Sequence, residues 1–300
     1  MYRHIATTSD AIAPPATAFA SAMAAERNSS RWPALLQGFK AIQLPEMSHA
    51  ALLRRTDTKY LLSEDQLFRA LARLTDHYRV LEIDGRRLHR YQTLYFDTPD
   101  LALYQQHHNG WRSRYKVRKR AYTDSDLAFL EIKQKTNTNT TIKSRRRTRS
   151  LSSQLPRNAA PFLHKHYPYQ VEELEAKLFN AFHRITVVSA LSVERLTGYA
   201  TLQFVWNGVC VPLIGIAIAE VKQDGFSVDS EFIGQMRAVG VRATGFSKYC
   251  IGVSMLYPGV KRNRFKPLLR QIDKLSQKER TACPAYSFHW DFSSISSLRC

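Results

Sequence analysis

The chain has 300 residues, and 44% of them are hydrophobic, which is enough for a buried core in one large domain or two small ones. Its 44 Lys and Arg residues outnumber 25 Asp and Glu residues, so the formal net charge is +19. A balance of this kind implies an anionic partner such as a nucleic acid, a phosphorylated metabolite or an anionic lipid surface, without choosing among them.

The cysteines argue against a disulfide-rich or zinc-binding protein, and the apolar runs argue against a membrane-spanning helix. The four cysteines are scattered and form no C-x-x-C pair, so a disulfide framework or a zinc site is not expected. A reducing compartment, the cytoplasm, is the expected location. The longest apolar run, Val209–Ala219, contains Pro212 and Gly215 and falls well short of the ~20 residues that a membrane helix needs.

In chain order, the first predicted segment is a loosely ordered leader over residues 1–45, rich in Ala, Ser, Thr and Pro. Ser63 to Gln66 form a capping-box pattern that predicts a helix with apolar residues at helical spacing after it. The apolar spacing over Val171–Phe182 predicts a second helix. Strands are predicted over residues 91–96, 185–193, 199–204 and 209–222, and a short helix over residues 230–239. From residue 261 the chain is predicted to be a basic, irregular tail.

Two stretches in the middle of the chain alternate in charge. In Trp111–Arg120 every second residue is cationic, and in Phe129–Lys135 the charged residues again share one parity. Because a strand sends alternate side chains to opposite faces, each stretch has one charged face and one mostly apolar face. For a single strand, the simplest interpretation is a charged face in water.

The number of such strands favours a different interpretation. Arg55, Asp57 and Lys59 share a parity, as do the cations from Lys143 to Arg149 and the pair Glu220 and Lys222. Several strands with one cationic face each indicate a sheet curled around a polyanion. Phosphate chains suit such a face, since Arg and Lys hold phosphate through charge-assisted hydrogen bonds.

The charged segments also match a known family in their order and spacing. They are R-x-D-x-K-Y from Arg55, Y-F-D-T from Tyr95, H-H-N-G-x-x-x-R-Y-K-V-R-x-R from His107, F-L-E-I-K-x-K from Phe129, K-x-R from Lys143, E-R-L-x-x-Y from Glu194, E-V-K from Glu220 and F-S-K-Y from Phe246. In their order and spacing, these segments resemble the polyphosphate polymerase domain of the vacuolar transporter chaperone (VTC) family, one of the triphosphate tunnel metalloenzymes. The resemblance implies an α+β fold, an antiparallel β-barrel tunnel of about eight strands with flanking helices, over residues 46–260.

The resemblance also implies roles for particular residues. Lys59, Arg118, Lys133, Arg195 and Lys248 are expected to be catalytic, and Arg114, Lys116, Arg120, Lys135, Lys143, Arg145 and Lys222 to bind phosphate. Glu220 matches the metal-binding glutamate of the family, and Glu131 is expected to orient neighbouring lysines or to help bind the metal. The implied metal is Mn²⁺ or Mg²⁺.

One segment departs from the family pattern. Where the family has an Arg followed by T-F-D, this chain has the uncharged stretch Ala200–Val205. The tunnel is therefore expected to lack one phosphate contact, at Thr201, and one carboxylate.

The resulting functional hypothesis is a polyphosphate polymerase that transfers the γ-phosphoryl group of ATP onto a polyphosphate chain. Two alternatives remain open: a tunnel triphosphatase, and a module that binds polyphosphate or inositol phosphate without turnover. The expected partners are ATP and inorganic polyphosphate, with a membrane-protein partner left open. A nucleic acid is not expected, because binding it would need cations and aromatic residues on an outer surface.

Overall fold

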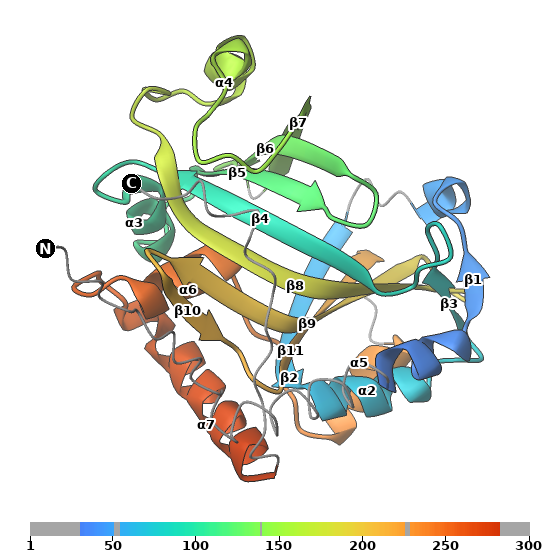
Figure 1. Cartoon of the computed structure of the whole chain (residues 1–300). Helices are drawn as coiled ribbons and strands as arrows, with labels where there is room; N and C mark the ends of the chain where they lie inside the picture. Colours follow the sequence, from blue (N-terminus) through green and yellow to red (C-terminus); the bar gives the residue numbers. More distant parts are fainter. Residues whose placement is uncertain (1–30, 51–54, 139, 226–228, 283–300) are drawn as a thin grey trace, which may run out of the picture.

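The computed structural model describes residues 31–50, 55–138, 140–225 and 229–282, which form one strongly curved sheet with helices around it (Figure 1). The strands are β1 Lys40–Ile42, β2 Arg55–Ser63, β3 Tyr78–Leu81, β4 His89–Asp97, β5 Arg114–Tyr122, β6 Leu127–Lys135, β7 Thr141–Thr148, β8 Glu175–Ser189, β9 Glu194–Trp206, β10 Val209–Pro212 and β11 Ile216–Asp224. The helices are α2 Glu64–Ala72, α3 Ala102–His108, α4 Ala160–His166, α5 Glu231–Ala238, α6 Lys248–Leu256 and α7 Lys266–Ala282, with 3₁₀ turns η1 Pro45–Ala50, η2 Arg157–Ala159 and η3 Asn263–Phe265. Within the described part of the chain, no helix is long and apolar enough to span a membrane.

The main sheet follows the strand order β2-β11-β9-β8-β4-β5-β6-β7, and each pair along this path is antiparallel. The predicted α+β fold with about eight antiparallel strands is therefore confirmed. The end strands β2 and β7 do not pair with each other in the described residues, so hydrogen bonding leaves the sheet open.

The segment before α6 links β2 to β5 across the curve of the sheet. Ala243 forms an isolated bridge with Tyr60, and the Thr244 amide donates to the carbonyl oxygen of Lys59 at 2.7 Å. Ser247, which caps α6, accepts a hydrogen bond from the Lys116 ammonium at 2.9 Å. This segment therefore connects strands that lie far apart in the strand order.

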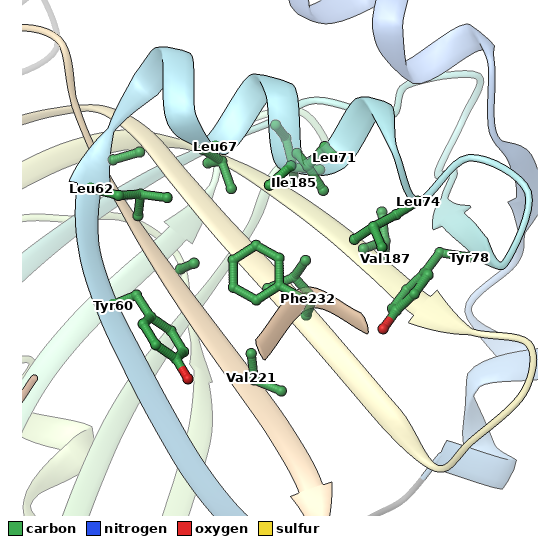
Figure 2. Packing of buried hydrophobic residues seen from close by; sticks show 14 of the residues in the cluster. Tyr60, Leu62, Leu67, Leu71, Leu74, Tyr78, Ile185, Val187, Val221 and Phe232 are labelled. Carbon is green, nitrogen blue, oxygen red and sulfur yellow. The ribbon is translucent and has the colours of Figure 1, made fainter. Parts of the chain in front are cut away.

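Helices cover the outer face of the sheet. Against β2, β11, β9 and β8, the helices α2 and α5 pack apolar side chains such as Leu67, Leu71 and Phe232 (Figure 2). The predicted capping box begins α2, because the Ser63 hydroxyl accepts from the Gln66 amide at 3.1 Å and the Gln66 side chain accepts from the Ser63 amide. Against β4, β5 and β6, residues from η2 and α4 complete a second buried cluster.

The inner face is covered at one end only. There α6 packs on Leu178 and Phe204, and α7 adds Leu268 and Ile272 to the same cluster. A Cβ at Gly252 would approach the side chains of Leu178 and Phe204 within 3 Å, so the close approach of α6 to the sheet needs this glycine. The rest of the inner face is left for the charged side chains.

The helix predicted over Val171–Phe182 is wrong, since most of this segment lies in β8. The strand is buried on both faces, so apolar residues do not alternate along it. Leu178 and Phe182 face the α6 cluster, whereas Phe179 and Ala181 face the outer cluster. A strand with two apolar faces can match a helical period by chance.

The predicted leader and tail are also corrected in part. Residues 31–37 are helical and β1 pairs with β3, and Trp32, Leu36 and Phe39 are buried in the α2 cluster. The predicted irregular tail contains η3 and the helix α7. The remaining parts of both segments, residues 1–30 and 283–300, lie outside the described residues.

Candidate functional site

The strand register places the predicted site residues on one face of the sheet, which we call the cationic face. On one side Lys59 pairs with Glu220, and Lys222 pairs with Arg195. Directly opposed residues share a face. Neighbouring residues of the other parity, such as Tyr60 and Val221, lie in the helix-covered outer cluster. The cationic face is therefore the inner one.

The other half of the site follows the same rule on β5, β6 and β7. Its pairs are Arg114 with Lys135, Lys116 with Lys133, Arg118 with Glu131, Lys133 with Lys143, and Glu131 with Arg145. Arg120 lies opposite Thr93, on the same face. Lys143 and Arg145 are exposed on the edge strand β7, whereas the β5 and β6 residues are half-buried. Every predicted site residue on a strand thus lies on the cationic face.

Lys248 reaches the same face from the first turn of α6. Its ammonium nitrogen lies 3.2 Å from the ring centroid of Tyr199 and 4.5 Å from that of Phe182. Both rings belong to inner-face positions of β9 and β8. Burial, with Arg120 and Arg118 adding to it, lowers the pKa of Lys248 well below its usual value, although Glu220 acts in the opposite direction.

Glu131 neutralises part of the positive charge that β5 places on the cationic face. Its carboxylate accepts from the Arg118 guanidinium at 2.7 Å and lies 3.9 Å from Arg120. Burial opposes ionisation, but the two arginines outweigh it and lower the pKa of Glu131 to about 2. Glu131 is therefore ionised at neutral pH and holds the arginines in place.

Glu220 is the centre of a second charge cluster. It pairs with Lys222 and lies 3.9 Å from Lys59, and its other oxygen accepts from the Tyr199 hydroxyl at 3.1 Å. Lys222 also lies 3.7 Å from Asp57. Although burial opposes ionisation, Lys222 and Lys59 hold the pKa of Glu220 well below its usual range.

In the described part of the chain, other cations of this face have no carboxylate partner of the kind that Glu131 and Glu220 provide. Burial lowers the pKa of Lys116 to about 8, with Arg114 and Arg118 adding to it, and that of Lys133 to about 7, with Lys116 and Lys143 adding to it. Among the described residues, no carboxylate lies within ion-pair distance of either ammonium. Burial is the larger cause of both shifts, and the neighbouring cations add to it because no carboxylate of the described residues offsets them.

Arg184 is a cation of this face that the sequence analysis missed. Its guanidinium donates to the Thr186 hydroxyl at 3.1 Å and to the Tyr91 hydroxyl at 3.4 Å. It pairs in register with Tyr199, so it lies on the cationic face. It was missed because it falls between the segment predicted as a helix and the strand predicted to begin at Ile185. The inner-face alternation through Arg184 and Thr186 would have revealed it.

Thr201, the position expected to lack a phosphate contact, does not lie on the cationic face. Thr201 lies at an irregularity of the β8–β9 register, with φ of 52°. Its amide donates to the Glu64 carboxylate at 2.9 Å, and its hydroxyl is hydrogen-bonded to His183 at 2.7 Å. Since His183 precedes Arg184 in β8, its side chain points away from the cationic face. Thr201 therefore contacts the outer side, and Arg184 supplies an additional cation.

The carboxylates of the face offer few metal ligands. Within the described residues there is no group of three His, Cys, Asp or Glu side chains that could hold a metal ion. Glu220 and Asp57 are joined through Lys222, whereas Glu131 is occupied by Arg118 and Arg120. Mg²⁺ is usually bound through one or two carboxylates together with substrate phosphates. Glu220, with Asp57 nearby, is therefore the part of this face that could contribute carboxylate oxygens to a divalent cation.

Comparison with known proteins gives one family and a set of distant structures. The model of the VTC domain family matches residues 54–257. A candidate adenylate cyclase from Bacillus halodurans has 12% identity, with a TM-score of 0.44 over 68% of this chain and 97% of its own. A candidate adenylyl cyclase from Hippeastrum, described as having a dominant triphosphatase activity, also has 12% identity, with a TM-score of 0.37 over 68% of this chain and 98% of its own. A conserved hypothetical protein from Pyrococcus furiosus has 9% identity and a TM-score of 0.37, covering 65% of this chain and 99% of its own. No curated protein matches the sequence significantly.

Proposed function

Because the chain belongs to the VTC domain family, we propose that it is a polyphosphate polymerase, which uses the cationic face to transfer the γ-phosphoryl group of ATP onto a polyphosphate chain. At the coarser level it is a triphosphate tunnel domain. The proposal places the triphosphate of ATP and the end of the acceptor chain together on the inner face of the sheet.

The observation that carries the proposal is the group of cations that have no carboxylate partner. Lys116, Lys133, Arg184 and Lys248 are partly buried, and among the described residues none of them forms an ion pair. Burial lowers the pKa of Lys116, Lys133 and Lys248, so holding these charges away from water is costly unless a ligand pairs with them. A chain of phosphates is the ligand that supplies several adjacent negative charges, each with oxygens for charge-assisted hydrogen bonds.

The reaction needs positioning and counter-charge more than proton transfer. The terminal phosphate of the acceptor is already an anion, so it attacks without a general base. The main obstacle is repulsion between the two anions, which the fixed ammonium and guanidinium groups offset. Because these groups are held in a partly dehydrated site, they need little reorganisation as charge moves toward the leaving diphosphate.

Individual residues have distinct proposed roles. Lys116 and Lys133 lie opposite each other on β5 and β6 and bind one stretch of phosphates, while Arg184 and Lys248 bind another beside Tyr199. Glu220, with Asp57 nearby, would hold Mn²⁺ or Mg²⁺, which supplies further neutralisation of phosphate charge when bound. The proposed phosphate-binding set is completed by Lys59, Arg114, Arg118, Arg120, Lys135, Lys143, Arg145, Arg195 and Lys222.

Incubating the purified protein with ATP and Mn²⁺, followed by gel electrophoresis and ³¹P NMR of the product, tests the proposal. We expect phosphate chains to accumulate, and Lys133→Gln to abolish their formation. Lys165→Gln, which removes an exposed charge from α4, is the matched control and should leave the rate unchanged. Orthophosphate as the sole product would make the protein a hydrolase, and no turnover with tight triphosphate binding would make it a receptor.

A further inference from the structure

A row of exposed cations runs along α7 outside the cationic face. Lys266, Arg270, Lys274 and Lys278 are four residues apart, so they follow one slowly winding side of the helix, and all are exposed. The opposite side carries Leu268 and Ile272, which are buried in the inner-face cluster. Among the described side chains, one carboxylate, Asp273, lies near the row and is also exposed. The described residues of this row form no ion pair with a carboxylate.

Arg264 connects this row to the cationic face. Its amide donates to Nε2 of His108 at 3.3 Å, and its guanidinium donates to the His108 carbonyl oxygen at 3.5 Å. On the same turn, the Arg114 guanidinium donates to the Trp111 carbonyl oxygen at 2.6 Å. Gly110 lies between these two contacts, and a Cβ there would overlap the Arg264 guanidinium. The two arginines are therefore held against one short turn at the start of β5.

The result is a continuous series of cations from the inside to the outside of the fold. Lys116 and Arg114 follow each other on the cationic face of β5; burial lowers the pKa of Arg114, and Arg264 is close enough to lower it further. The α7 row begins two residues after Arg264. In Figure 1, α7 leaves the end of the sheet near α3 and α6 and runs along the outside of the molecule. At 1.5 Å per residue, the row from Lys266 to Lys278 extends over roughly 18 Å.

We propose that Arg264 and the α7 row (Lys266, Arg270, Lys274 and Lys278) bind the part of a phosphate chain that extends beyond the cationic face. The proposal rests on the proposed function, since the chain must first be held on that face. Repulsion between Arg114 and Arg264 favours an anion that bridges them, and a chain leaving at this turn meets the α7 row next. Short ligands such as triphosphate end inside the fold and do not reach it.

The test compares inorganic triphosphate with long-chain polyphosphate by isothermal titration calorimetry. One variant combines Lys266→Gln, Arg270→Gln, Lys274→Gln and Lys278→Gln. The control variant combines Lys40→Gln, Arg73→Gln, Arg157→Gln and Lys165→Gln, which remove the same charge from exposed positions on β1, η2, α4 and the end of α2.

We expect the α7 variant to bind long chains about tenfold or more weakly, with a smaller salt dependence, and to bind triphosphate as tightly as the unmodified protein. The control variant should retain both affinities. An equal loss of long-chain affinity in the two variants, or no loss in either, would overturn the proposal. A loss of triphosphate affinity in the α7 variant that matched its loss of long-chain affinity would also overturn it. Binding of anionic lipid vesicles that depends on the row, with long-chain affinity unchanged, would assign the surface to a membrane and overturn it too. If the unmodified protein bound no triphosphate, the proposed function itself would fail. If it bound triphosphate but its affinity for long chains did not depend on the α7 row, only this inference would be refuted.

Discussion

Replacing Arg184 by glutamine separates ligand binding from stability more clearly than any other single change. Among the described residues, the hydrogen-bond partners of Arg184 are the hydroxyl groups of Thr186 and Tyr91, and its guanidinium lies 5.3 Å from the Tyr91 ring centroid. Glutamine keeps a polar group of lower volume at this position but removes the charge. If Arg184 binds phosphate, the change removes one charge-assisted hydrogen bond, which typically contributes ~1.5–3 kcal/mol.

This free energy corresponds to a rise in the dissociation constant for triphosphate of about 10- to 150-fold. The free protein should lose only a little resistance to denaturant: although burial opposes the Arg184 charge, Tyr91, Tyr199 and Glu220 favour it and raise its pKa, while no carboxylate of the described residues forms an ion pair with it. The control is Arg90→Gln on the neighbouring strand β4, which breaks an exposed ion pair with Asp124 on the other face. Calorimetric titration with inorganic triphosphate and urea unfolding measure the two quantities. An unchanged triphosphate affinity, or a loss of stability as large as the loss of binding energy, would show that Arg184 supports the fold and does not bind phosphate.

Three further changes test other parts of the site. Glu220→Gln should retain the fold and most of the triphosphate affinity but abolish metal-dependent turnover, and full activity in this variant would remove Glu220 from the site. Because Lys116 and Lys133 have pKa values of about 8 and 7 in the free protein, an arriving anion should raise both values, so triphosphate binding at pH 8 should take up protons and weaken as the pH rises. Calorimetry in buffers of different ionisation enthalpy detects this uptake, and a zero proton balance at that pH would contradict it. Thr201→Arg should leave triphosphate affinity unchanged and lower the free energy of unfolding by about 1 kcal/mol, since it removes the hydrogen bond to His183; a clear gain in affinity would return Thr201 to the cationic face.

The sequence predicts the charged half of this fold better than the apolar half. On β5 and β6 one face is charged and the other apolar, so the period of two is visible and the register follows from it. On β8 both faces are apolar, and the same segment resembles a helix until its partners are known. Arg184 was missed for this reason, and not because its own environment is unusual.

The irregularities of the fold were the least predictable features. The departure at Ala200–Val205 suggested a lost cation, but the register shift opposite His183 turns Thr201 outward, which no spacing in the sequence indicates. Trp32, Leu36 and Phe39 were assigned to a loosely ordered leader because the surrounding composition is rich in small residues. Their burial depends on contacts with α2 and β8, which are distant in the sequence.

The central claim, that the cations without carboxylate partners bind phosphate, is tested most directly by a crystal structure with a non-hydrolysable ATP analogue. We expect phosphate density on the inner face of the sheet, within hydrogen-bond distance of Lys116, Lys133, Arg184 and Lys248. Density for the triphosphate on another surface of the fold, out of contact with these four side chains, would contradict it.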